Sequence, residues 1–127
     1  MTLLVPFDGS PLAGAALDRA TRFADAFDES VVAVAVIPQN DASYARERGW
    51  IEAGEPFDRE TIASRLRDRV HDRAPDAEFR AEHVSRGTHA GSIARVIRRV
   101  AREAGASTVF VGSTNAGRLV TTLSSVG

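Results

Sequence analysis

Two short polar segments carry the groups in this sequence that are best suited to chemistry. The segment 8–10, Asp-Gly-Ser, follows the apolar residues 3–7, and the segment 112–117, Gly-Ser-Thr-Asn-Ala-Gly, follows residues 108–111, Thr-Val-Phe-Val. A carboxylate such as that of Asp8 accepts hydrogen bonds from a ligand, and free backbone N–H groups among small residues can cradle a phosphate. Each segment is also an ordinary turn sequence, so neither defines a function by itself.

The other reactive residue types do not form a set that could catalyse a reaction or hold a metal ion. The chain has 16 arginines, no lysine and no cysteine. Disulfides, thiolate ligands, Schiff-base lysines and a Walker-type phosphate loop are therefore excluded. The three histidines, at positions 71, 83 and 89, are not spaced like metal ligands, and no serine lies in a Gly-x-Ser-x-Gly elbow. We therefore expect neither an enzyme nor a metal site.

Two enzymatic interpretations of Asp8 fail on single positions. A phosphatase of the haloacid dehalogenase type has a second aspartate two residues after its nucleophile, and here that position is Ser10. A receiver domain has its phosphorylated aspartate at the end of the third strand, and here the third predicted strand ends in Val84-Ser85. We interpret Asp8 as a carboxylate that contacts a ligand or forms a turn.

Apolar runs and amphipathic stripes predict the elements that position these segments. Continuous apolar runs suit strands buried on both faces of a parallel sheet, whereas apolar residues at three- and four-residue steps predict helices. Ser10 is a suitable helix N-cap and Pro11 a suitable first helical residue. We expect strands at residues 3–7, 31–37, 78–84 and 108–111, helices at 11–27, 58–72 and 93–104, a long loop at 39–57 and the start of a last helix at 119–123.

This alternation predicts an α/β fold, a three-layer sandwich around an open, doubly wound parallel sheet with right-handed crossovers. Ligands of such sheets bind outside the carboxyl ends of the strands, so the segments 8–10 and 112–117 face each other if their strands are neighbours. The chain stops at Gly127. We therefore expect the fifth edge strand to be missing and the free edge of strand 108–111 to be covered by a second copy of the chain.

Length and charge favour one soluble domain over residues 1–127. The 127 residues are 43% hydrophobic and carry a formal net charge of −1, which gives no strong attraction to nucleic acid or to an anionic membrane. No apolar run approaches the roughly 20 residues that span a bilayer. Residues 1–6 lack the basic flank of a signal peptide, so we expect a cytoplasmic protein.

A row of arginines accompanies the predicted helix 93–104. Arg95, Arg98, Arg99 and Arg102 all lie outside its apolar stripe. A solvated helix face is the ordinary interpretation of such a row, and contact with an anionic partner is the alternative.

Three parts of the chain resemble the universal stress protein family. Residues 3–10, Leu-Leu-Val-Pro-Phe-Asp-Gly-Ser, precede an alanine-rich helix, as in the opening of these proteins. Residues 109–113, Val-Phe-Val-Gly-Ser, resemble the family's fourth strand and glycine loop, and the Arg86-Gly87 turn before Ile93 resembles its third-strand exit. The resemblance covers essentially the whole chain and implies a Rossmann-like fold of the adenine nucleotide alpha hydrolase type, short at its carboxyl end.

The resemblance also implies where a nucleotide binds. Base and ribose would contact Pro6, Phe7, Asp8 and Val36, and phosphates would contact Val111, Gly112, Asn115, Gly117, Ser124, Ser125 and Val126. The family's phosphate loop has a second glycine three residues after the first, where this chain has Asn115. The family's loop closes with a glycine followed by a serine, and this chain has Ser124 and Ser125 in their place. The distance from position 115 to this closing pair is one residue shorter than in the family pattern.

Two functions remain open at this point. The resemblance implies a regulatory module of the stress response that binds ATP or another adenine nucleotide, with Mg²⁺, and acts as a homodimer. The altered positions in the phosphate loop leave room for the alternative, a universal stress protein without nucleotide that serves as a dimerising protein-interaction domain. We favour nucleotide binding because Asp8 and Gly112 are both present.

Overall fold

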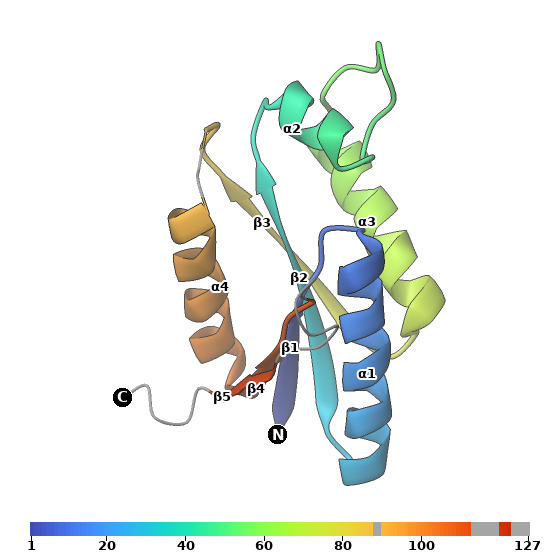
Figure 1. The fold of residues 1–127 in the computed structure, drawn as a ribbon, viewed down its shortest axis with the longest axis vertical. Helices are drawn as coiled ribbons and strands as arrows, with labels where there is room; N and C mark the ends of the chain where they lie inside the picture. The colour runs from blue at the N-terminus through green and yellow to red at the C-terminus, as the bar shows by residue number, and fades with distance from the viewer. Residues whose placement is uncertain (88–89, 113–119, 123–127) are drawn as a thin grey trace.

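The computed structural model describes residues 1–87, 90–112 and 120–122. Its elements in chain order are β1 (Thr2–Pro6), α1 (Pro11–Phe27), β2 (Ser30–Pro38), α2 (Ala42–Glu47), α3 (Arg59–Arg73), β3 (Glu78–Val84), α4 (Ala90–Ala104), β4 (Ala106–Phe110) and β5 (Val120–Thr122). Figure 1 shows the strands between two layers of helices, with α4 on one side and α1 and α3 on the other.

The strands in the described residues form one sheet in the order β3-β2-β1-β4-β5. β1 runs parallel to both β2 and β4, and β2 runs parallel to β3. The chain thus builds the sheet outward from β1 to β3 and then returns to the other side of β1 with β4. The switch point lies between β1 and β4, and the predicted three-layer, doubly wound α/β fold is confirmed.

The structure corrects our expectation for the edge of β4. That edge is not left free, because β5 pairs with β4 in the antiparallel direction, from Thr108 opposite Thr122 to Phe110 opposite Val120. The segment predicted to begin a last helix at residues 119–123 contains this short strand instead. Val120, Thr121 and Thr122 are all β-branched, which favours an extended backbone over a helix.

The predicted loop at residues 39–57 also contains an unexpected helix, α2. Its N-cap is Asp41, whose Oδ1 accepts a hydrogen bond from the Tyr44 N–H at 3.1 Å. Ala45 is fully buried, so the helix packs against the body of the domain. Six residues give little periodicity in the sequence, which is why α2 escaped prediction.

β1 lies at the centre of the sheet and is buried on both faces. Leu3 and Val5 belong to the core on the side of α1 and α3, whereas Leu4 belongs to the core under α4. Alternate residues of a strand point to opposite faces, so one short strand joins both helix layers. This burial fixes the position of Asp8, which lies two residues after the end of β1.

A network of four charged side chains joins β3 to α4. Arg99 donates to Glu82 at 2.7 Å and to Glu103 at 3.3 Å, and Arg80 donates to the same two carboxylates at 3.2 and 2.8 Å. Burial by itself would raise the pKa of Glu82, but the hydrogen bonds from Arg99 and Arg80 outweigh it and lower that pKa. The Glu82 side chain is 18% exposed.

We predict that Glu82→Gln destabilises the fold at neutral pH by about 1 kcal/mol, because it removes charge-assisted hydrogen bonds. The folded-state pKa of Glu82 lies below its unfolded value of about 4.3, so this stability is present above that value and is lost as the pH falls through the folded pKa. Urea unfolding at neutral pH and in acid, below the folded-state pKa of Glu82, measures the difference.

The matched control is Glu78→Gln, which neutralises an exposed carboxylate at the start of the same strand. It should leave the free energy of unfolding nearly unchanged. A loss from Glu82→Gln that persists undiminished in acid would contradict the assignment of this stability to the ionised carboxylate.

Candidate functional site

A pocket of about 410 Å³ opens at the carboxyl ends of β1, β2 and β4. Six of the residues predicted for a nucleotide site line it together: Pro6, Phe7, Asp8, Val36, Val111 and Gly112. The other predicted residues, Asn115, Gly117, Ser124, Ser125 and Val126, lie outside the described residues. The two polar segments singled out in the sequence therefore meet at this pocket through Asp8 and Gly112, although β1 and β4 are far apart in the chain.

Asp8 is held by a tight turn between β1 and α1. Its Oδ1 accepts a hydrogen bond from the Ser10 N–H at 2.9 Å, and Gly9 has a φ of +83°, which favours glycine. Ser10 then caps α1, its Oγ accepting from the Ala13 N–H at 3.2 Å, as predicted. The second carboxylate oxygen of Asp8 has no hydrogen-bond partner among the described residues, so it is available to a ligand.

Gly112 forms the opposite side of the pocket and lies against the first turn of α1. A Cβ atom at this position would be 2.5 Å from the carbonyl oxygen of Leu12 and 3.0 Å from the nitrogen of Ala13. These are backbone atoms inside a helix, so they cannot move aside easily. Only glycine allows the backbone after β4 to pass this close to α1. The close approach places Gly112 in the same pocket as Asp8.

The third side of the pocket comes from α2 and was missed in the sequence. Tyr44 and Arg48 line the pocket, and the Arg48 guanidinium lies over the Tyr44 ring, 3.5 Å from its centroid. Burial raises the pKa of the Tyr44 phenol, Arg48 opposes this, and Asp8 and Asp41 add to it. The phenol is therefore neutral and can donate or accept a hydrogen bond. Tyr44 and Trp50 are the chain's single tyrosine and single tryptophan, and both lie in the predicted loop 39–57. Two large aromatic residues there are the sequence signal that this loop packs against the rest of the domain.

Trp50 connects α2 to the Asp8 turn. Its indole Nε1 donates to the Asp8 carbonyl oxygen at 2.7 Å, its ring lies 5.6 Å from that of Tyr44, and its side chain is 2% exposed. Asp8 is thereby hydrogen-bonded at its backbone by a residue 42 positions away. The turn and the α2 wall of the pocket hold each other in place.

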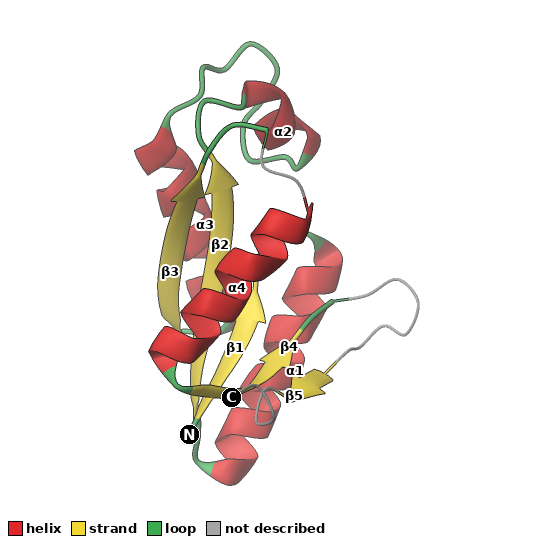
Figure 2. Cartoon of the chain, turned by 90° about the vertical axis from the view of Figure 1, so that its left-hand side faces the viewer, coloured by secondary structure: helices red, strands yellow, loops and turns green. Residues whose placement is uncertain are grey.

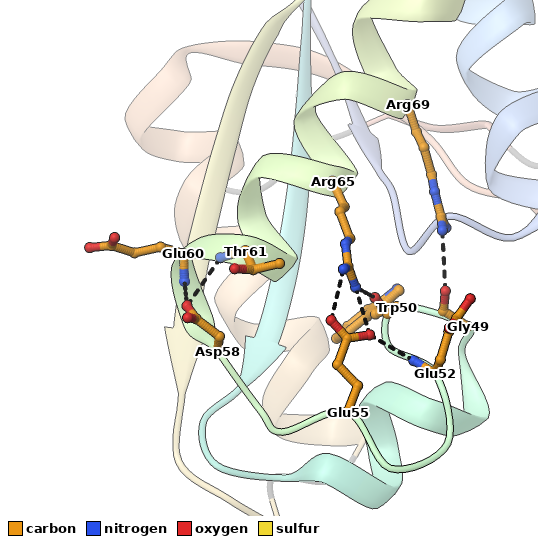
Figure 3. A network of polar contacts seen from close by, with 9 residues as sticks. All are labelled: Gly49, Trp50, Glu52, Glu55, Asp58, Glu60, Thr61, Arg65 and Arg69. Carbon is orange, nitrogen blue, oxygen red and sulfur yellow. Dashed lines mark hydrogen bonds and ion pairs between the residues drawn. The ribbon is translucent and has the colours of Figure 1, made fainter.

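Two arginines of α3 hydrogen-bond the loop that contains Trp50, as Figure 3 shows. Arg65 donates to the Trp50 carbonyl oxygen at 2.9 Å and forms a two-pronged ion pair with Glu55 at 3.0 and 2.7 Å. Arg69 donates to the Gly49 carbonyl oxygen at 3.1 Å. Both arginines therefore anchor carbonyl groups of an irregular loop to a regular helix.

The side chains of the described residues do not form a metal site. No group of three or more His, Cys, Asp or Glu side chains in residues 1–87, 90–112 and 120–122 could hold a metal ion. None of the helices in that part of the chain is long and apolar enough to cross a membrane.

The four parallel strands β1 to β4, with a pocket at their switch-point edge, define a doubly wound α/β domain of the kind that places ligands outside its strand ends. Within that class, the chain belongs to the universal stress protein family, whose sequence profile matches residues 1–126. No curated protein matches the chain.

Two solved structures are similar to this chain. A protein of the universal stress protein family from Burkholderia pseudomallei is 25% identical, with 90% of this chain and 82% of that chain covered and a TM-score of 0.53. A universal stress protein in complex with cAMP is 24% identical, with 86% of this chain and 73% of that chain covered and a TM-score of 0.49.

We predict that Gly112→Ala destabilises the fold by about 2–3 kcal/mol, because the added methyl group displaces β4 from the first turn of α1. Urea unfolding measures the loss. The matched control is Gly54→Ala, which adds the same methyl group where nothing lies within 4 Å. It should cost about 1 kcal/mol, from its positive φ alone. Equal losses from the two variants would show that the contact with Leu12 does not constrain position 112.

Proposed function

We propose that this universal stress protein is a regulatory module that binds an adenine nucleotide in the pocket between Asp8 and Gly112. The observation that carries the proposal is that these two residues, from segments about a hundred positions apart, line the same pocket. In this arrangement the base and ribose lie beside Pro6, Phe7, Asp8 and Val36. The phosphates follow the chain from Val111 and Gly112 into the segment that contains Asn115.

The chemistry of the pocket wall suits a nucleoside. Val34, Val36 and Ile97 give an apolar surface for the faces of a base. The free carboxylate oxygen of Asp8 accepts hydrogen bonds from donors such as ribose hydroxyl groups. The pocket volume, about 410 Å³, lies near the lower end of the range of roughly 300–1,000 Å³ for small-molecule sites.

The proposed role is binding rather than catalysis. The pocket residues include Asp8 but neither a histidine nor a lysine to serve as a base beside a nucleophile. Mg²⁺ would enter with the phosphates of the nucleotide. The occupied and empty forms would differ at the two pocket walls, and a homodimer of the chain would present that difference to its partners.

A second candidate function rests on the altered phosphate loop. Asn115 stands where the family pattern has glycine, and Ser124 stands near the closing glycine. Without these glycines the backbone approaches phosphates less closely. A universal stress protein that has lost nucleotide and acts as a dimerising interaction domain would show no calorimetric binding of ATP, ADP or AMP.

We predict that Asp8→Ala weakens nucleotide binding ten- to a hundredfold, corresponding to about 1.5–3 kcal/mol for a lost charge-assisted hydrogen bond. Titration calorimetry with ATP measures the dissociation constant. Asp25→Ala is the matched control, since it removes an exposed carboxylate from α1 that does not line the pocket. An unchanged dissociation constant for Asp8→Ala, with the fold intact by circular dichroism, would refute the role of Asp8.

A further inference from the structure

A second hollow lies on the α4 side of the sheet and shares no lining residue with the nucleotide pocket. It has a volume of about 1010 Å³ and runs between α4 and the carboxyl end of β3. In Figure 2, α4 crosses the sheet obliquely, and its ribbon does not run over the upper part of β3. We call this hollow the α4–β3 groove.

The groove concentrates positive charge. Arg95, Arg99 and Arg102 line it from α4 and share one side of that helix, and Arg86 lines it from the turn after β3. Arg99 is neutralised by Glu82 and Glu103 in the network described above.

The other three arginines have no such counter-charge. Arg86, Arg95 and Arg102 form no ion pair with any residue in the described ranges, and all three are exposed. Three unpaired guanidinium groups around one hollow stand out in a chain whose formal net charge is −1. Together they give the groove a positive potential that attracts anions.

We propose that the α4–β3 groove binds an acidic polypeptide segment, in addition to the nucleotide pocket and independently of it. Arg95 and Arg102 are seven residues apart on α4, so they lie about 10 Å apart along the helix axis. In a polyproline II chain, which has about three residues per turn and rises about 3.1 Å per residue, residues three positions apart point to the same side and are separated by about 9 Å. A segment with a carboxylate at every third residue therefore matches both arginines, with Arg86 available to a further carboxylate.

The observations favour a polypeptide over a nucleic acid. No Phe, Tyr or Trp side chain lines the groove in the described part of the chain, and the imidazole of His83 is the one ring there, so the groove lacks a row of rings on which successive bases could stack. Glu82 and Glu103 neutralise the lining residue Arg99, so this part of the groove wall has no net positive charge to attract a continuous phosphate backbone. A peptide can place neutral residues opposite these glutamates, whereas a nucleic acid carries a charge at every nucleotide.

The test uses a fluorescein-labelled peptide of repeated Glu-Gly-Ser units, whose carboxylates have the required spacing. Fluorescence anisotropy at roughly 50 mM salt, where exposed charges are weakly screened, measures its binding to the full chain. We expect the double variant Arg95→Ala with Arg102→Ala to weaken binding about tenfold.

The control removes the same charge elsewhere. Arg98→Ala with Arg19→Ala changes two exposed arginines, of which Arg98 is on α4 itself, and neither lines the groove. We expect it to change the affinity less than about twofold, because only charges facing the groove contact the peptide.

Three results would each overturn the proposal. The first is an equal loss of affinity in both double variants, which would mean diffuse attraction rather than a groove. The second is no saturable binding of the Glu-Gly-Ser peptide, or equally tight binding of a neutral control peptide in which every Glu is replaced by Gln. The third is tighter binding of oligo-dT than of the Glu peptide, which would make the occupant a nucleic acid.

Discussion

The hydrogen bond from the Trp50 indole to the Asp8 carbonyl oxygen is the contact on which the pocket depends. It is 2.7 Å long, and the Trp50 side chain is almost completely buried. The Asp8 residue is only partly buried, so the net contribution of this bond is that of an ordinary hydrogen bond, about 1 kcal/mol, and it couples the loop that carries Trp50 to the turn that carries Asp8. Arg65 and Arg69 extend this constraint to α3.

The opposite wall depends on a steric constraint rather than on a hydrogen bond. The chain leaves β4 at Gly112 against the backbone of Leu12, where no side chain fits. Asp8, at the start of the turn into α1, thus lies between a hydrogen-bonded wall from α2 and a close-packed wall from β4. Both walls are held by contacts within the described residues.

Local signals account for the parts that the sequence predicted well. The buried strand before Asp8, the Ser10 cap and the arginines of α4 follow from composition and spacing within a few residues. The parts that were missed depend on contacts between distant residues. Trp50 bonds a residue 42 positions away, and β5 is only three residues long and is defined by its pairing with β4. The sequence showed the row of arginines on α4, but it did not show that the row lies beside the carboxyl end of β3.

Trp50 is the only tryptophan in the chain, so its indole N–H gives a single, unambiguous NMR signal. The most direct measurement follows this ¹H–¹⁵N signal during a titration with ATP, with inorganic triphosphate as the control. Binding beside Asp8 should shift the signal saturably with ATP, because the bond from Trp50 ends on the residue that would contact the ribose. A signal that stays in place up to about millimolar ATP, equivalent to binding weaker than about 4 kcal/mol, would contradict a nucleotide site in this pocket.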